Sequence, residues 1–540
     1  MFGAKPGRSG SVDPVLVFLV QLHAIPYIQS AMKFERSAGI LLHPTSLPGK
    51  FGIGDMGTDA FRFVDFLEAA GQKLWQVLPL GPTGFGDSPY QTFSAFAGNP
   101  FIVSPEKLAE DGLLDREDCD RVPDSEPKCV DFGKVIGYKM GLLKKAFQNF
   151  KTRTVHERTV AFKNFCTVNK DWLEDYASFM ALKDQHDGGH WAQWEPALVA
   201  RKQAALHDAV RKHSDDIMFY KFVQFIFFKQ WNELKSYANG KGIKVVGDLP
   251  IFVAYDSADV WANKDLFDID KNGILLTKAG VPPDYFSPTG QLWGNPLYRW
   301  DAMSKGDFPW WQSRISKLLE LVDIMRIDHF RGFDAYWEIP GDAPTAEKGR
   351  WVKTPGEKFF STVKRHLGEL PIIAEDLGLI TKSVRALRDK FDFPGMKILQ
   401  FAFGTNMERR FLPHNLEANC VVYTGSHDND TTRGYFEKAK HDHNDIYVSA
   451  QRYLNYFGDD VRMELIRAAY ASVANTVIIP MQDVLNLGTQ ARMNFPGKLG
   501  GNWTWRFTWE QISPPLAGEF KNLAELYDRP PKPQPPEISI

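Results

Sequence analysis

The chain of 540 residues is long enough to bury a large core and to form more than one compact unit. Its 64 Lys and Arg residues nearly balance 66 Asp and Glu residues, so neither nucleic acid nor an acidic membrane is an expected partner. No apolar run reaches the roughly 18 residues that would span a bilayer. The four cysteines form no Cys-x-x-Cys motif and are too few for a disulfide framework, so a reducing, cytoplasmic location is expected.

The two ends of the chain differ from the rest. Residues 1–32 are expected to be a leader or a disordered extension. They carry a short apolar patch at 15–22 with basic residues before it and few acids, a pattern shared by signal and transit peptides. A plastid is therefore the alternative location. Residues 530–540 are rich in Pro and Lys and are expected to form a loose tail.

Between these ends, eight short runs of β-type apolar residues alternate with stretches of helical periodicity. The expected strands are residues 39–43, 73–80, 244–251, 323–330, 371–378, 396–403, 420–428 and 476–485. The expected helices include 59–70, 134–149, 160–185, 215–238, 310–321, 357–367 and 461–471. Strand–helix alternation is typical of a parallel sheet, so eight strands predict an α/β fold, a (β/α)₈ TIM barrel over residues 33–529.

Two long segments interrupt this pattern, after the second and third strands. Residues 102–213 are expected to form a helical insertion. Residues 254–312 form a second insertion, which contains a loop at 280–300 that is dense in Pro, Gly and aromatic residues. The helix at 215–238 repeats apolar residues at helical spacing, which indicates a core-facing stripe that returns the chain to the barrel.

Acidic residues stand at the carboxyl ends of four of the expected strands. They are Asp248, Asp328, Glu375 with Asp376, and Asp428 with His427 beside it. The carboxyl ends of barrel strands converge on one pocket, where clustered carboxylates repel unless Arg, His or substrate hydroxyls organise them. A single acid at a strand end is usually structural, but acids at four such ends favour catalysis.

Two chemistries fit such a cluster. Carboxylates with His bind Mg²⁺, Mn²⁺ or Zn²⁺, although no His-x-x-x-His or His-Glu-x-x-His motif is present. Retaining cleavage of a glycoside fits better, because it needs an ionised nucleophile and a protonated acid about 5–5.5 Å apart. Arg326 shares a strand face with Asp328 and is expected to lower its pKa. Glu375 follows the apolar residues 372–374, which are expected to raise its pKa as an acid catalyst requires.

Eight motifs carry a resemblance to a known family. They lie at residues 39–49, 86–91, 247–253, 282–286, 291–298, 325–332, 374–378 and 491–494. Together they resemble the α-amylase clan of retaining glycosidases, and more closely its 4-α-glucanotransferase branch, called amylomaltase or disproportionating enzyme, of glycoside hydrolase family 77. The motifs span nearly all of residues 34 to about 508.

The resemblance implies a role for each site residue. Asp328 would be the nucleophile, Glu375 the general acid/base, and Asp428 the carboxylate that steadies the transition state. The implied substrate-binding residues are Tyr90, Asp248, Asp284, Phe286, Gln291, Trp293, Arg326, His427 and Asn494. Structural roles stay open for Asp248 and Tyr90. Phe85 stands where some relatives carry Tyr, which puts a second glucan-binding site there in doubt.

The implied activity is transfer of an α-1,4-glucan segment from a donor malto-oligosaccharide to the 4-hydroxyl of an acceptor glucan or glucose. The implied partners are malto-oligosaccharides and glucans derived from starch or glycogen. An α-1,4-glucan hydrolase, a non-catalytic glucan-binding barrel and a metal hydrolase are the alternatives. The chain has no phosphate loop and no dinucleotide fingerprint, so no cofactor is expected. The resemblance to this branch implies no metal site.

Overall fold

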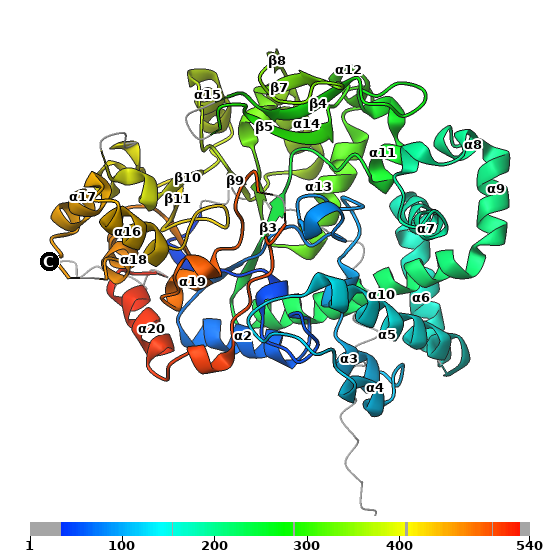
Figure 1. The fold of residues 1–540 in the computed structure, drawn as a ribbon, viewed down its shortest axis with the longest axis horizontal. Coiled ribbons are helices and arrows are strands. Elements are labelled where there is room, and N and C mark those ends of the chain that lie inside the picture. Colours follow the sequence, from blue (N-terminus) through cyan, green and yellow to red (C-terminus); the bar gives the residue numbers. More distant parts are fainter. Residues whose placement is uncertain are drawn as a thin grey trace, which may run out of the picture.

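A closed barrel of eight parallel strands forms the centre of the molecule in the computed structural model (Figure 1). The structure describes residues 34–153, 155–283, 287–404, 409–458, 460–498 and 500–529. The barrel strands, in chain order, are β1 (Ser37–Leu41), β2 (Leu74–Gln76), β3 (Lys244–Leu249), β6 (Ile324–Ile327), β9 (Ile372–Ala374), β10 (Gly395–Ile398), β11 (Cys420–Tyr423) and β12 (Thr476–Pro480). β1 pairs with both β2 and β12, which closes the ring and confirms the predicted (β/α)₈ fold.

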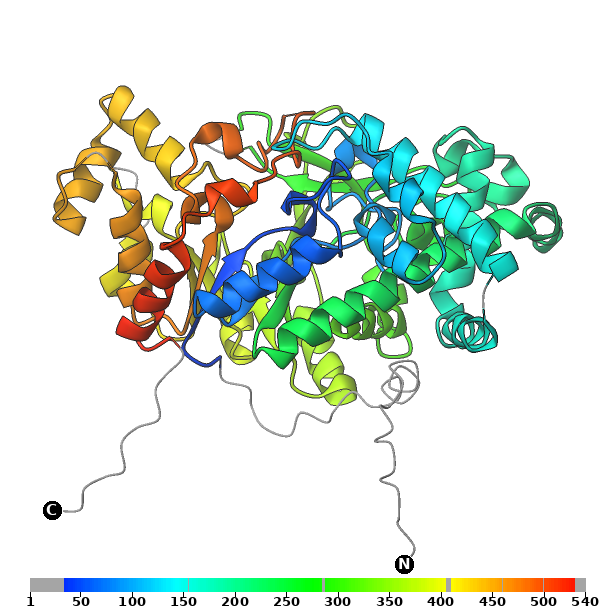
Figure 2. The same cartoon turned by 90° about the horizontal axis from the view of Figure 1, so that it is seen from below.

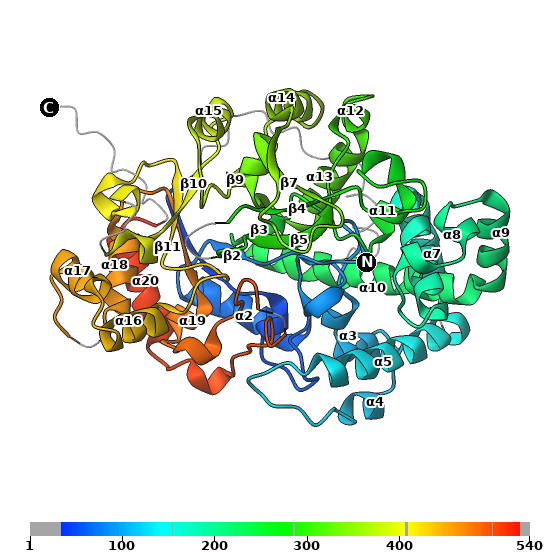
Figure 3. The ribbon, with the colours of Figure 1, turned by 45° about the horizontal axis from the view of Figure 1, so that its top comes forward.

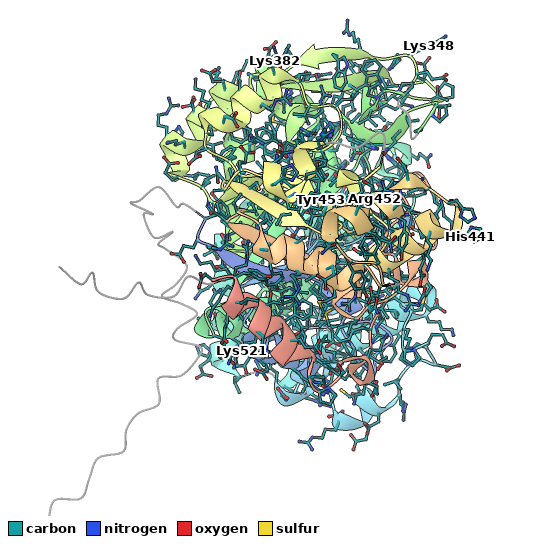
Figure 4. The ribbon with its side chains drawn as sticks, turned by 90° about the vertical axis from the view of Figure 1, so that its left-hand side faces the viewer. Lys348, Lys382, His441, Arg452, Tyr453 and Lys521 are labelled. Atoms are coloured by element: carbon teal, nitrogen blue, oxygen red, sulfur yellow. The ribbon has the colours of Figure 1, made fainter. Side chains whose placement is uncertain are left out.

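Helices surround the barrel. Those on the main path of the chain are α2 (Thr58–Ala69), α10 (Ser214–Gly240), α13 (Pro309–Leu321), α14 (Gly356–Leu367), α15 (Lys382–Lys390), α16 (Thr432–His441), α17 (Asp445–Leu454), α18 (Arg462–Ala471), α19 (Met481–Val484) and α20 (Leu516–Leu526). Figure 4 looks onto the side formed by α16, α17 and α20, where His441, Tyr453 and Lys521 lie. Within the described ranges, each helix is too short or too polar to cross a bilayer.

A helical lobe follows β2 and stands to one side of the barrel (Figure 2). It contains α3 (Pro105–Glu110), α4 (Arg116–Asp120), α5 (Phe132–Arg153), α6 (His156–Val168), α7 (Lys170–Gln185), α8 (Pro196–Val199) and α9 (Gln203–Lys212). α10 packs against α5, α6 and α7 of the lobe and also against α2 and β3 of the barrel. Its buried Phe-rich surface therefore joins the two parts.

The single helix expected at 160–185 is two helices, because Asn169 separates α6 from α7. The buried Asn169 side chain donates to the Phe165 carbonyl at 2.9 Å. Its Oδ1 accepts from Trp172 Nε1 at 3.0 Å and from Lys317 Nζ at 2.8 Å. Asn side chains that bond to nearby backbone compete with the helix, so a break is favoured at this position.

A four-stranded antiparallel sheet lies beside the carboxyl ends of β3 and β9 (Figure 3), and the sequence patterns do not predict it. It comprises β4 (Thr277–Val281), β5 (Gln291–Pro296), β7 (Ala335–Pro340) and β8 (Arg350–Lys353), in the order β5-β4-β7-β8. The segment after β3 supplies two strands and the segment after β6 supplies the other two. The short helices α11 (Ala258–Ala262) and α12 (Trp300–Met303) complete the insertion after β3, which is thus only partly helical.

Several predicted strands are longer than the observed ones, because buried turns follow them directly. The run at 323–330 ends as a strand at Ile327, since His329 takes a left-handed backbone (φ 49°) and a 3₁₀ turn follows at Phe330–Phe333. The run at 476–485 divides into β12 and α19. Apolar content marks burial, and it does not show where hydrogen bonding between strands stops.

Candidate active site

The carboxyl ends of β3, β6, β9 and β11 bring Asp248, Asp328, Glu375 and Asp428 together, whereas Asp376 pairs with Arg388 of α15 at 2.7 Å. Asp248 lies within β3, opposite Arg326 of β6. Ile327 of β6 lies opposite Ala374 of β9. Asp328 and Glu375 directly follow these residues, so they lie side by side at the carboxyl ends of neighbouring strands. The Glu375 amide donates to the Ile327 carbonyl at 3.0 Å, which fixes this alignment.

Arg326 is shared between two of these acids. Its Nη1 lies 2.5 Å from Asp248 Oδ2 and 3.0 Å from Asp328 Oδ1. The side chains of Arg326 and Asp248 are almost fully buried, whereas 30% of the Asp328 side chain is exposed. Arg326 thus compensates a buried carboxylate and stands beside an accessible one, as expected from its spacing in the strand.

Burial raises the pKa of Asp328 to about 8, with Arg326 opposing this rise and Asp248, Glu375 and Asp428 adding to it. Arg326 acts in the expected direction, but the expectation of a lowered pKa for Asp328 is wrong, because the net pKa is raised. One positive neighbour does not offset the removal of water and the gathering of several acids at one barrel end. Asp328 and Glu375 influence each other's charge, so the two carboxyls titrate as a pair.

Glu375 is held by backbone amides. Its Oε2 accepts from the His329 amide at 2.7 Å, and its Oε1 accepts from the Leu377 amide at 2.8 Å. Burial is the main cause that raises the pKa of Glu375, while Arg326 and the two amides act in the opposite direction. The predicted rise in pKa is confirmed, and it favours the protonated form that a proton donor needs.

Asp428 is positioned by the segment that follows β12. Asn494 Nδ2 donates to Asp428 Oδ1 at 2.7 Å, and Arg492 donates to the Asp428 carbonyl at 2.6 Å. About 47% of the Asp428 side chain is exposed, so it remains accessible to a ligand. Arg492 is not among the predicted site residues, although it lies in the motif at 491–494 that includes Asn494.

An aromatic pair covers one side of this cluster. The rings of Tyr90 and His427 stack with centroids 5.3 Å apart and planes 18° apart. Trp503, which no motif indicates, packs against both rings at centroid distances of 5.8 and 6.1 Å. The Tyr90 hydroxyl lies 2.7 Å from Asp248 Oδ2 and 2.9 Å from His427 Nε2. Tyr90 therefore joins residues from β3 and from the turn after β11.

The antiparallel sheet borders the cluster through β5. The Trp293 ring meets the His329 ring edge-on, with centroids 4.8 Å apart. Trp293 Nε1 donates to Gln291 Oε1 at 3.2 Å. Asp284 and Phe286, the two other residues predicted in this loop, lie outside the described residues.

Three of the acids accept hydrogen bonds from nitrogen donors. Asp248 accepts from Arg326, Glu375 from two amides and Asp428 from Asn494. Among the residues that the structure describes, no group of three or more His, Cys, Asp or Glu side chains is arranged to hold a metal ion. The arrangement suits acid–base and nucleophilic chemistry on a neutral substrate with hydroxyl groups.

The comparisons with known proteins cover nearly all of the chain. A family model described as 4-alpha-glucanotransferase matches residues 42–511. A 4-alpha-glucanotransferase of Thermus thermophilus is 49% identical over 506 residues, which cover 92% of this chain and 100% of that protein. One from Synechocystis sp. is 48% identical over 502 residues, 92% of this chain and 98% of that protein. A solved amylomaltase from Streptococcus agalactiae, in complex with acarbose, is 40% identical with a TM-score of 0.88, covering 92% of this chain and 100% of that one.

Proposed function

Because this chain belongs to the 4-alpha-glucanotransferase family, we propose that Asp328, Glu375 and Asp428 transfer α-1,4-glucan segments by a retaining double displacement. The observation that carries this proposal is the pairing of neighbouring strand ends. Asp328, next to Arg326, and Glu375, in a buried amide cradle, leave β6 and β9 at one level. Such a pair supplies the nucleophile and the acid that retaining cleavage needs.

In the first step, an Asp328 carboxylate oxygen attacks C1 of a donor glucosyl unit. Glu375 gives its proton to the glycosidic oxygen, the C1–O bond breaks, and the shortened glucan leaves. Arg326 favours placing the negative charge of the pair on Asp328. Asp428 stabilises the positive charge that develops on the sugar ring.

In the second step, the 4-hydroxyl of an acceptor glucan attacks C1 of the glucosyl ester. Glu375, now a carboxylate, removes the hydroxyl proton, and the ester bond to Asp328 breaks, which restores both acids. We propose that the loop at 280–300 covers the bound glucan, with Asp284, Phe286, Gln291 and Trp293 against the sugars. Transfer exceeds hydrolysis when this cover favours an acceptor sugar over water.

Product analysis with maltotriose tests the proposal. We expect glucose together with chains longer than maltotriose, and we expect Asp328→Asn to lose both products while keeping the thermal unfolding midpoint of the wild type. Glucose and maltose without longer chains would support the hydrolase alternative. A near-normal rate in Asp328→Asn would remove the nucleophile from the proposal. Glucan binding without turnover in the wild type would support the non-catalytic barrel.

Chelation separates this proposal from the metal hydrolase. Since Asp248, Glu375 and Asp428 accept hydrogen bonds from nitrogen donors, we expect EDTA to leave the rate of maltotriose disproportionation unchanged. A loss of activity that added Mg²⁺, Mn²⁺ or Zn²⁺ restores would favour a metal enzyme.

We propose that the enzyme acts in the cytoplasm, with a plastid as the alternative if residues 1–32 serve as a transit peptide. The four sparse cysteines support a reducing compartment. Fusing residues 1–32 to a fluorescent protein in plant cells tests this, because import into plastids would favour the alternative.

A further inference from the structure

A chain of hydrogen bonds joins His427, Tyr90, Asp248 and Arg326 under the site, and its two ends lie beside Asp428 and Asp328. The direction of each hydrogen bond follows from the groups that it joins. The first fixed point is Asp248. Its Oδ2 lies 2.5 Å from Arg326 Nη1 and 2.7 Å from the Tyr90 hydroxyl. A carboxylate paired with a guanidinium has no proton to donate, so the Tyr90 hydroxyl donates to Asp248.

The second fixed point is the Tyr90 oxygen, which has given its only proton to Asp248. It can therefore only accept from His427 Nε2, 2.9 Å away. Burial lowers the pKa of His427, which keeps the ring neutral with a single N–H. That proton must lie on Nε2, and Nδ1 is left as an acceptor.

The burial of Asp248 shows how it acts. Its side chain has no exposed surface, while 30% of Asp328 and 47% of Asp428 are exposed. Asp248 is thus screened from a bound sugar by Tyr90 and Arg326, the two groups that it bonds. It influences the pocket through these neighbours.

We propose that Asp248 and Tyr90 hold His427 as the Nε2-protonated tautomer, with Asp248 as a positioning residue in place of a substrate ligand. The chain runs from His427 to Tyr90 to Asp248, and Arg326 bonds both Asp248 and Asp328. His427 Nε2 also lies 3.5 Å from Asp428 Oδ2, so the chain links two of the proposed catalytic acids. The effect of this hydrogen-bond chain on catalysis rests on the proposed function, whereas the tautomer of His427 is a property of the free enzyme.

Nitrogen NMR of the full chain with labelled histidines tests the tautomer directly. The His427 signals are identified by their loss in His427→Gln. We expect a pyrrole-type shift at Nε2 and a pyridine-type shift at Nδ1. In Tyr90→Phe, which keeps the stacked ring, we expect the Nε2 proton to move upfield and to exchange faster with water. An Nδ1-protonated ring, an imidazolium, or an unchanged Nε2 proton in Tyr90→Phe would overturn the proposal.

Kinetics test whether the residues act as one unit. We expect Tyr90→Phe to lower kcat/KM about threefold to tenfold, as for one lost hydrogen bond. In an Asp248→Ala background the same change should cost less than about twofold, since the chain is already broken. Asp248→Asn, whose amide oxygen still accepts from Tyr90, should restore part of the loss. If Tyr90→Phe lowered kcat/KM by the same factor in the wild type and in the Asp248→Ala background, the two residues would not act through one hydrogen-bond chain.

Tyr470→Phe is the matched control. Tyr470 lies in α18, outside the hydrogen-bond chain of the site, and its buried hydroxyl donates to Gln72 at 3.0 Å. We expect it to leave the His427 signals and kcat/KM unchanged, and an equal loss in this variant would reduce the Tyr90 effect to general destabilisation. Full activity in Asp328→Asn would refute the proposed function, while the predicted NMR pattern would stand.

Discussion

At the scale of single residues, the environment of each carboxyl assigns its task. Asp328 and Glu375 carry the same functional group, and burial raises the pKa of both. Arg326 acts on both, but it contacts only one of them directly: its Nη1 lies 3.0 Å from Asp328 Oδ1, whereas the oxygens of Glu375 accept from two backbone amides. A cation in direct contact favours the anion, so we propose that the proton of the pair lies on Glu375 and the charge on Asp328.

This assignment predicts how Glu375→Gln depends on the leaving group and on pH. With maltotriose, we expect a loss of at least about 100-fold, the usual contribution of a general acid. With α-maltosyl fluoride, whose fluoride leaves unprotonated, we expect the first turnover to persist. Activity of the wild type should fall as pH rises through the elevated pKa of Glu375, and this fall should vanish from the first turnover of the variant.

Stopped-flow measurement of fluoride release, compared with glucose release from maltotriose, checks this prediction. Glu369→Gln is the matched control, because it makes the same change at an exposed surface ion pair. Equal losses with both donors in Glu375→Gln would mean that this residue is not the acid.

At the scale of elements, the sequence predicts the eight barrel strands because their buried apolar runs recur between helices. The four acids follow from the same pattern, since barrel strands converge at their carboxyl ends. The antiparallel sheet does not follow, because β5 and β8 are partly exposed strands and because the sheet is joined by the pairing of β4 with β7, which are separated in the chain by α13 and β6. Trp503 and the His329 amide that donates to Glu375 are likewise tertiary features without a local signal.

The junction of α6 and α7 gives a prediction at this scale. Replacing Asn169 by Ala removes a buried acceptor for the Trp172 indole and for the Lys317 ammonium. We expect a destabilisation of about 1–3 kcal/mol, because the Trp172 indole loses its partner and Lys317 Nζ loses one of two partners while keeping Glu320. Urea unfolding followed by tryptophan fluorescence measures the effect. Asn415→Ala, at an exposed turn, should change stability by less than about 0.5 kcal/mol, and a similar value for both variants would contradict this account.

At the scale of the whole molecule, a buried ion pair joins the helical lobe to the barrel. Lys139 of α5 lies 2.8 Å from Asp55, which belongs to the segment between β1 and α2, and both side chains are nearly inaccessible. Lys139 also donates to the Val103 carbonyl at 3.0 Å. Burial raises the pKa of Asp55, and Lys139 opposes this rise.

Lys139→Met is therefore expected to cost about 3–5 kcal/mol at neutral pH, because it leaves the Asp55 charge buried without its partner. The pKa of Asp55 in the folded variant then lies further above its unfolded value of 3.8. The loss should shrink as pH falls toward that value, since Asp55 takes up a proton in the folded state. Urea midpoints measured between pH 5 and 8 test both statements.

Two further variants sharpen this test. The double change Lys139→Met with Asp55→Asn removes both charges and should recover part of the stability. Lys353→Met, which breaks an exposed pair with Asp334 at 2.9 Å, should cost less than about 1 kcal/mol. A pH-independent loss in Lys139→Met would contradict the role of the buried carboxylate.

The most direct test of the account is to trap the glycosyl ester. Glu375→Gln, given α-maltosyl fluoride without an acceptor, should form the ester and release it slowly, because no base activates the attacking hydroxyl. Mass spectrometry of the intact protein should show one added maltosyl group, and peptide mapping should place it on Asp328. An adduct on any other carboxylate, or fluoride release with no adduct, would contradict the assignment of Asp328 as the nucleophile.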